Sequence, residues 1–277
     1  MSKSLQPLFT EEQIKASLKQ FEDTLGEKIV KVQPLVSVIM PVFNCKRYVS
    51  IAIESVRLQS YRAIELIIVD DASEDGTTEL LQKIIDVRNP DIKVIYRLKN
   101  GGTGAALNDG IKAAKGEYIH WLSADDVMYP DCVRDMMLFG AEDHYQKRKD
   151  TIFYSDYDII DERGSFIGEF IEPNRDANDL EIKVKELWSH FYGNGSTTLI
   201  HRNVFRKCGL FDDNLKHSED YEFWLRATQL FHVDMIRVPI KTIKYRNHPD
   251  QLTNKIGGSL DRTIKESIKR RMTELTV

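Results

Sequence analysis

The chain has 277 residues, of which 42% are hydrophobic and 30% charged, and this composition is ordinary for a soluble globular protein. A formal net charge of -4 gives no reason to expect a nucleic-acid partner. The apolar runs are too short to span a bilayer, and the N-terminus lacks the apolar core of a signal peptide. Three widely spaced cysteines favour neither disulfides nor a zinc site, so we expect reduced thiols in a cytoplasmic protein.

Residues 1–33 are expected to form an N-terminal helical extension. The segment from Thr10 to Gln13 has the form of a capping box, with a hydroxyl at the N-cap and a glutamine three positions later. The apolar residues that follow recur at helical spacing and form a single stripe: Ile14, Leu18, Phe21 and Leu25. We expect this stripe to pack on the body of the same chain, with a second copy as the alternative.

Strands and helices alternate between residues 34 and 126. Apolar runs predict four buried strands, and apolar residues at helical spacing predict helices between them. The expected strands cover residues 36–40, 65–69, 92–96 and 118–122, and the expected helices cover residues 49–56 and 77–85 and begin again at about Ala105. This order implies right-handed crossovers and therefore an α/β fold with a Rossmann-like, mostly parallel sheet flanked by helices.

The alternation ends after Asp126. Turn residues, apolar runs and acidic residues at a helix start predict the next elements. These are a helix from Pro130 toward Tyr145, a hairpin of residues 151–157 and 165–171 around the turn 161–164, and a helix after Ser218. We place residues 34–250 in one domain.

Residues 251–277 are expected to form a C-terminal amphipathic helix. Its apolar face carries Leu260, Ile264, Ile268 and Met272, and basic residues flank that face. Three arrangements stay open: packing on the body, self-association into a homodimer, or peripheral contact with an anionic membrane surface. The third arrangement would place the protein at the cytoplasmic face of a membrane.

Two acidic pairs stand where predicted strands end. Asp70 and Asp71 follow the second strand, and Asp125 and Asp126 follow the fourth. The carboxyl ends of neighbouring parallel strands open into one crevice, where open α/β sheets bind ligands. Carboxylates gathered this closely repel one another unless a divalent cation or a hydrogen-bonding ligand lies among them. The pattern predicts a nucleotide and a metal ion at this edge of the sheet.

Six segments, taken in order, resemble family 2 glycosyltransferases with the GT-A fold. They are residues 36–44, 65–73, 100–110, 123–126, 218–224 and 245–248, so the resemblance spans residues 34–250. It implies an inverting enzyme of the hexosyltransferase type that takes a sugar from a nucleoside-diphosphate-sugar. Residues 34–126 would then form the donor half, and residues 127–250 the acceptor and catalytic half.

The resemblance places the donor nucleotide at the first acidic pair. Asp71 is implied to accept hydrogen bonds from uracil or ribose, while Pro41 and Phe43 flank the base. The chemistry agrees, because a carboxylate accepts from N–H groups and hydroxyls and an aromatic ring stacks on a base. Asn100 and Gly102 are implied to shape the wall of this site, and a UDP-sugar is the favoured donor. The alternative is that either aspartate of the pair caps the next turn.

The second acidic pair matches the metal motif of the fold. The resemblance implies that Asp126 is a direct ligand of Mn²⁺ or Mg²⁺ and that Asp125 contacts the ribose or the transferred sugar. Such ions are held by one or two carboxylates together with the phosphates of the substrate. His248 is a candidate late ligand, because relatives carry a histidine after the last core strand. The alternatives are a solvated turn for the aspartates and an ordinary surface residue for the histidine.

Asp220 is the expected catalytic base. An inverting transfer needs one carboxylate to take the proton of the acceptor hydroxyl as that hydroxyl attacks. Asp220 lies at a predicted helix start beside Glu219, within the string that matches the base motif of the family. An ordinary acid of a first helical turn is the alternative.

The acceptor is expected to be a glycan or a lipid-linked molecule, as in polysaccharide biosynthesis. Two other classes remain as alternatives. A sugar nucleotidyltransferase would carry a glycine-rich basic loop after the first strand, whereas residues 41–45 contain no glycine. A non-catalytic nucleotide-sugar binding module would not need both Asp126 and Asp220.

Overall fold

The computed structural model describes residues 33–85, 91–140, 149–171, 194–215 and 218–251, together with residues 266 and 270. The predicted N-terminal helix, most of the C-terminal helix and residues 172–193 lie outside this part. In the tail, the Arg270 guanidinium lies 3.4 Å from the Asp212 carboxylate, which is one contact between the tail and the body. Within the described residues no helix is both long and apolar enough to cross a bilayer.

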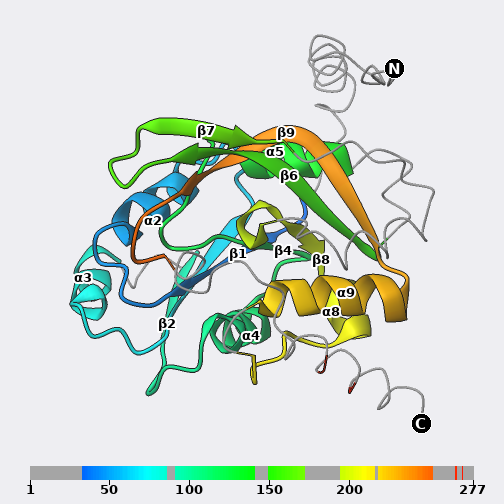
Figure 1. Cartoon of the computed structure of the whole chain (residues 1–277), viewed down its shortest axis with the longest axis horizontal. Helices are drawn as coiled ribbons and strands as arrows, with labels where there is room; N and C mark the ends of the chain where they lie inside the picture. The colour runs from blue at the N-terminus through cyan, green and yellow to red at the C-terminus, as the bar shows by residue number, and fades with distance from the viewer. Residues whose placement is uncertain are drawn as a thin grey trace.

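The first half of the domain is the predicted alternation of strands and helices (Figure 1). Its elements are β1 (Val36–Val42), α2 (Val49–Arg57), β2 (Ile64–Asp70), α3 (Thr77–Ile84), β3 (Ile92–Tyr96), α4 (Thr103–Ala113) and β4 (Tyr118–Trp121). The four strands are parallel and lie in the order β3-β2-β1-β4. Helix α4 begins at Thr103, two residues before the predicted start, because Gly102 takes a φ of 86° and allows the chain to turn into the helix there.

The second half extends the same sheet with strands of mixed direction. Its elements are β5 (Val127–Met128), α5 (Cys132–Gly140), β6 (Thr151–Ile160), β7 (Phe166–Phe170), the 3₁₀ helix η1 (Gly195–Thr197), β8 (Leu199–His201), α8 (Arg202–Cys208), α9 (Glu219–Phe231) and β9 (Asp234–Arg246). The main path continues from β4 through β8, β6 and β9 to β5, and β7 pairs with β6 beside it. The predicted hairpin is therefore present as β6 and β7, and the helix predicted after Ser218 is α9. The predicted end of the earlier helix, Tyr145, lies outside the described residues.

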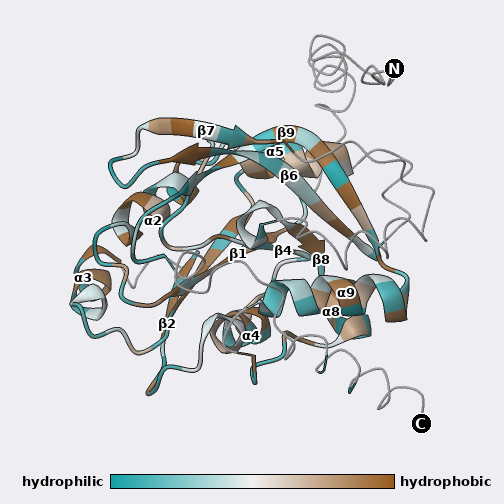
Figure 2. Ribbon diagram, viewed as in Figure 1, coloured by the Kyte–Doolittle hydropathy of each residue, from teal (hydrophilic) through white to brown (hydrophobic). Residues whose placement is uncertain are grey.

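Strands β1 and β2 are largely buried on both faces because helices cover both sides of this part of the sheet. Val38 and Met40 of β1 face one hydrophobic cluster, together with the buried residues of α2, α3 and α5. Ile39, the residue between them, faces a second cluster with α4, α8 and α9. Figure 2 shows the hydrophobic residues of β2 and β8 inside the molecule, and Figure 1 shows α4, α8 and α9 together on one side of the sheet.

Candidate active site

The predicted site residues lie in three groups around the carboxyl ends of the parallel strands. The first group surrounds Asp71 at the end of β2, and the second surrounds Asp126 just after β4. Only β1 lies between β2 and β4, so these strand ends are separated by two strand spacings, about 10 Å. The third group is Asp220 and its neighbour Glu219 at the start of α9.

The start of α9 packs against the start of α4. A Cβ atom added to Gly104 in the first turn of α4 would lie 3.3 Å from the Cβ of Glu219. Gly102, which precedes α4, donates its N–H to an Asp71 carboxylate oxygen at 2.8 Å. The Asp71 and Asp220 groups are therefore linked through the start of one helix.

Asp126 is fully buried, and only one of its two carboxylate oxygens accepts a hydrogen bond. Its Oδ1 accepts the main-chain N–H of Arg246 at 2.9 Å. Its Oδ2 is equally buried and has no hydrogen-bond partner within 3.5 Å among the described residues, although the Ser196 hydroxyl lies near enough to lower the pKa of Asp126. Burial, and then the charge of Asp125, raise the pKa of Asp126 well above its ordinary value. A buried carboxylate oxygen without a donor is costly to leave in this state, so its position suits a bound cation.

His248 and Asp125 complete the second group. The His248 Nε2 lies 3.0 Å from Asp125 Oδ2, and the Arg246 Nε donates to the Asp125 carbonyl oxygen at 2.8 Å. The rings of Tyr48 and His248 are 4.9 Å apart between centroids. Carboxylate and water oxygens are the ligands that suit Mn²⁺ and Mg²⁺ best.

Among the residues with described positions, no three His, Cys, Asp or Glu side chains gather closely enough to hold a metal ion by themselves. A cation beside Asp126 would accordingly take further ligands from water and from the phosphates of a substrate. That arrangement is normal for Mg²⁺ with nucleotides. The Asp126 carboxylate therefore fits the predicted cation, and His248, whose Nε2 lies against Asp125, stays a predicted ligand.

Asp71 is buried and fully engaged. Its carboxylate accepts the N–H groups of Gly101 and Gly102 and pairs with the Arg97 guanidinium. Arg97 also bonds Asp109 of α4, with 2.9 Å between Nε and Oδ2. The carboxylate thus joins the end of β2 to the start of α4, and a nucleotide bound here would share it with these donors.

The other residues predicted to contact the nucleotide lie near Asp71 or in the loop after β1. Asn100 accepts the N–H of Gly102 at 3.2 Å through its Oδ1. Phe43 exposes 48% of its surface, and Pro41 is half-buried. The exposed Phe43 ring is available to stack on a base.

Asp70 has the plain structural role that the sequence left open. Its carboxylate accepts the main-chain N–H of Ser73 at 3.1 Å and the hydroxyl of Thr78. It therefore caps the turn that leads into α3, as aspartates commonly do.

Asp220 occupies the second position of α9. Its Oδ1 accepts the N–H of Tyr221 at 2.7 Å, and the helix N-terminus places further partial positive charge beside it. Burial nevertheless raises the pKa of Asp220 to about 7. Burial, followed by the charge of Asp220, raises the pKa of Glu219 to about 8. A carboxyl group with a pKa near neutrality is well matched to proton transfer.

Sequence reasoning missed three residues that hold these groups in place, namely Arg97, Tyr48 and Arg246. The signal for Arg246 was present, since it stands two positions before His248 in a segment that matches the family. Arg97 has no comparable signal, because its role depends on the contact between the end of β3 and Asp71, which is far away in the sequence.

Residues 37–209 match the family model described as Glycosyl transferase family 2. This chain belongs to that family. A relative described as an uncharacterized glycosyltransferase of Rickettsia typhi is 37% identical over 232 residues, which cover 82% of this chain and 69% of the relative. The family predicted from the sequence is therefore confirmed.

Two solved structures share the fold of this family 2 glycosyltransferase. S. aureus TarS 1–349 in complex with UDP-GlcNAc is 18% identical, with a TM-score of 0.63 over 84% of this chain and 65% of TarS. GalNAc-T7 with UDP, GalNAc and Mn²⁺ is also 18% identical, with a TM-score of 0.60 over 79% of this chain and 45% of that protein. The predicted GT-A fold is confirmed, with a sheet that is parallel in its first half and mixed in its second.

Proposed function

We propose that this family 2 glycosyltransferase moves a sugar from a UDP-sugar to a hydroxyl group of a glycan or lipid-linked acceptor, with inversion and with a divalent cation. The unpartnered, buried oxygen of Asp126 carries this proposal, because a cation would satisfy it where the fold would bring a diphosphate. The UDP-sugar and the Mn²⁺ present in structures of similar fold support the choice of ligands.

The nucleotide and the sugar of the donor are assigned to the first half of the domain, and the cation to one residue from each half. Asp71 holds the uracil or ribose with Phe43 and Pro41 against the base, and Asn100 and Gly102 form the adjoining wall. Asp125 holds the ribose or the transferred sugar. Asp126 and His248 would hold Mn²⁺ or Mg²⁺, and the bound ion would neutralise charge on the departing diphosphate.

Asp220 acts as the general base. It takes the proton of the acceptor hydroxyl while that oxygen forms a bond to the anomeric carbon of the sugar. The bond from this carbon to the diphosphate breaks on the opposite face, so the configuration inverts and UDP departs. The pKa near 7 leaves Asp220 able to accept a proton at neutral pH.

Replacing Asp220 by Asn tests the assignment, because the amide keeps the shape of the side chain but cannot accept the proton as a base. We expect Asp220→Asn to abolish sugar transfer and hydrolysis of the UDP-sugar, while UDP affinity in the presence of Mn²⁺ stays near that of the wild type. Asp213→Asn is the matched control, because Asp213 is exposed in the preceding turn. Turnover by Asp220→Asn at the wild-type rate would remove Asp220 from this role.

A further inference from the structure

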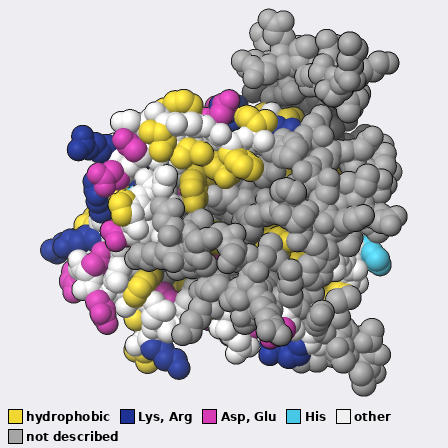
Figure 3. All heavy atoms as spheres, viewed as in Figure 1, with side chains coloured by type: hydrophobic (Ala, Val, Ile, Leu, Met, Phe, Trp, Pro, Cys, Tyr) yellow, Lys and Arg dark blue, Asp and Glu magenta, His cyan; other side chains and the backbone are white. Residues whose placement is uncertain are grey.

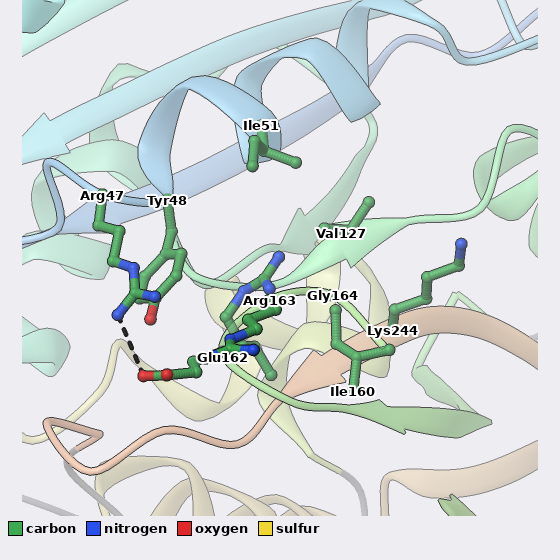
Figure 4. A pocket seen from close by; sticks show the side chains of 10 residues that line it. Arg47, Tyr48, Ile51, Val127, Ile160, Glu162, Arg163, Gly164 and Lys244 are labelled. Carbon is green, nitrogen blue, oxygen red and sulfur yellow. Dashed lines mark hydrogen bonds and ion pairs between the residues drawn. The ribbon is translucent and has the colours of Figure 1, made fainter. Parts of the chain in front are cut away.

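A pocket of about 400 Å³ opens beside the second group of site residues, on the side of α2. Arg47, Tyr48 and Ile51 line it from the start of α2, and the turn between β6 and β7 closes the opposite side with Glu162, Arg163 and Gly164. Val127, Ile160, Lys244 and Arg246 complete the lining (Figure 4). Its volume lies within the range of small-molecule sites in proteins.

Positive charge dominates the lining of this pocket, which we call the basic pocket. Four of its lining residues are cationic, namely Arg47, Arg163, Lys244 and Arg246, and one is acidic, Glu162. The Glu162 carboxylate pairs with Arg47 at 3.1 Å, and both side chains are well exposed. The lining therefore carries more positive than negative charge, which favours an anionic ligand.

The remaining lining is apolar. Ile51 leaves 51% of its surface exposed, and Val127, Ile160 and the ring of Tyr48 lie around the same space. A free inorganic anion would leave this surface without a partner. The pocket accordingly fits an anionic group attached to a carbon skeleton.

Two residues of the basic pocket also build the predicted cation site. The Tyr48 ring contacts the ring of His248, and the Arg246 main chain holds Asp126. The guanidinium of Arg246 lies 4.7 Å from the centre of the Tyr48 ring, so the two residues form one wall. A molecule in the pocket would therefore contact two residues that also contact the predicted cation site.

We propose that the basic pocket binds a phosphate group carried by the acceptor, so that the acceptor is a phosphomonoester or phosphodiester. This inference rests on the proposed function, which supplies the donor site next to the pocket. Arg163 and Lys244 are the cations that contact the phosphate, because Arg47 is engaged with Glu162 and Arg246 donates to the carbonyl oxygens of Asp125 and Asp161. The Lys244 Nζ lies 5.0 Å from the centre of the Tyr129 ring, a contact that does not use its hydrogen-bond donors on a carboxylate.

Such a phosphate has two sources, a soluble sugar or polyol phosphate and a phospholipid headgroup. The surface beside the pocket is compatible with the second source. Strand β7 follows the turn that carries Arg163, and it exposes Phe166 by 63% and Ile167 by 54%. Figure 3 shows hydrophobic side chains gathered on this part of the surface.

The test measures binding of inorganic phosphate by calorimetry, in EDTA so that no metal ion joins phosphate to the acidic site. The double variant Arg163→Gln/Lys244→Gln is compared with the wild type and with Lys93→Gln/Arg206→Gln, which removes two exposed charges elsewhere. We expect the pocket variant to bind phosphate at least about tenfold more weakly and the control to bind like the wild type. Equal binding by the pocket variant and the wild type would overturn the proposal.

Two further measurements separate the sources. Glycerol 3-phosphate is titrated by calorimetry, and sedimentation is followed with phosphatidylcholine vesicles that contain or lack phosphatidic acid. If the wild type binds either probe and the pocket variant does not, the result supports the proposal and identifies the source of the phosphate. If the wild type binds neither inorganic phosphate nor either probe, the proposal is overturned. Binding of UDP with Mn²⁺ by the wild type is measured in parallel. If the wild type does not bind UDP, the proposed function is rejected, whereas the phosphate measurement still tests the pocket.

Discussion

The four aspartates at the strand ends look alike in the sequence and differ sharply in their surroundings. Asp70 and Asp71 have their carboxylate oxygens occupied by donors from the protein. Asp126 keeps one buried oxygen without a donor, and Asp125 faces His248. Hydrogen-bond satisfaction therefore separates the structural aspartate, Asp70, from the one best placed for a cation, Asp126.

The raised pKa of Asp220 predicts how turnover depends on pH. Burial moves this pKa from 3.8 up to about 7, so the carboxyl becomes protonated as the pH falls through about 7. A protonated Asp220 cannot take the acceptor proton, and we expect kcat to fall about tenfold for each pH unit below this point. The measurement is kcat at saturating donor between about pH 5 and about pH 9. A rate that stays constant down to about pH 5 would contradict the assignment.

At this scale the sequence predicted the positions of the acidic residues better than their partners. Strand ends and a helix start follow from local patterns, and these patterns placed Asp71, Asp126 and Asp220 at the edges where they lie. The partners Arg97 and Arg246 come from segments distant in the chain, and their contacts depend on how the sheet is assembled. No local pattern carries that information.

Close packing of helix α4 against strand β1 positions the glycines next to Asp71 and Glu219. Gly110 of α4 faces Ile39 of β1 so closely that a Cβ atom at this position would overlap the Ile39 side chain. The absence of a side chain lets α4 lie near the sheet, and this position sets the location of Gly102 and Gly104 at the other end of the helix.

Replacing Gly110 by Ala is expected to destabilise the protein. Alanine favours helix formation by about 1 kcal/mol, but overpacking of a tight core typically costs about 1–3 kcal/mol. We expect a net loss of about 1 kcal/mol in the free energy of unfolding, measured by urea titration. Gly168→Ala in β7 is the control, because a Cβ atom there meets no other atom within 4 Å. An equal or higher stability for Gly110→Ala would show that α4 can move away from β1.

The second half of the sheet was harder to predict for physical reasons. Strands β1, β2 and β4 are largely buried and read as apolar runs, whereas basic residues interrupt β9, which also contains Pro239. The pairing of β6 with β9 shifts register at this point, from Val238 to Lys241, because proline has no N–H for the ladder. Strand β8 has only three residues, too few for a pattern, and is held by its neighbours β4 and β6.

At the scale of the whole molecule, the site draws on elements from both halves of the domain. Asp71 follows β2 and Asp126 lies between β4 and β5, while Asp220 lies in α9 and His248 follows β9. A ligand that contacts both halves in the folded state stabilises the whole domain, because the unfolded chain has no such site.

UDP together with Mn²⁺ is therefore expected to raise the melting temperature. At a free ligand concentration of about 100 times Kd, the stabilisation amounts to about 2.7 kcal/mol. We expect EDTA to remove most of the shift caused by UDP, and Asp126→Asn to have the same effect, as measured by differential scanning calorimetry. Asp131→Asn is the control, since Asp131 is a partly exposed aspartate that pairs with Arg134 before α5. A UDP shift of full size in EDTA would argue against a cation in donor binding.

Arg246 has a consequence for protein engineering. Its main-chain N–H donates to Asp126, its guanidinium donates to carbonyl oxygens of Asp125 and Asp161, and that guanidinium lies over the ring of Tyr48. Libraries made to change acceptor preference should randomise exposed positions such as Ile51 and Arg163 and leave Arg246 unchanged. A substitution of Arg246 would remove the hydrogen bonds to both Asp125 and Asp161. Every clone with that substitution would therefore combine the change in the pocket with a disturbed pair of aspartates.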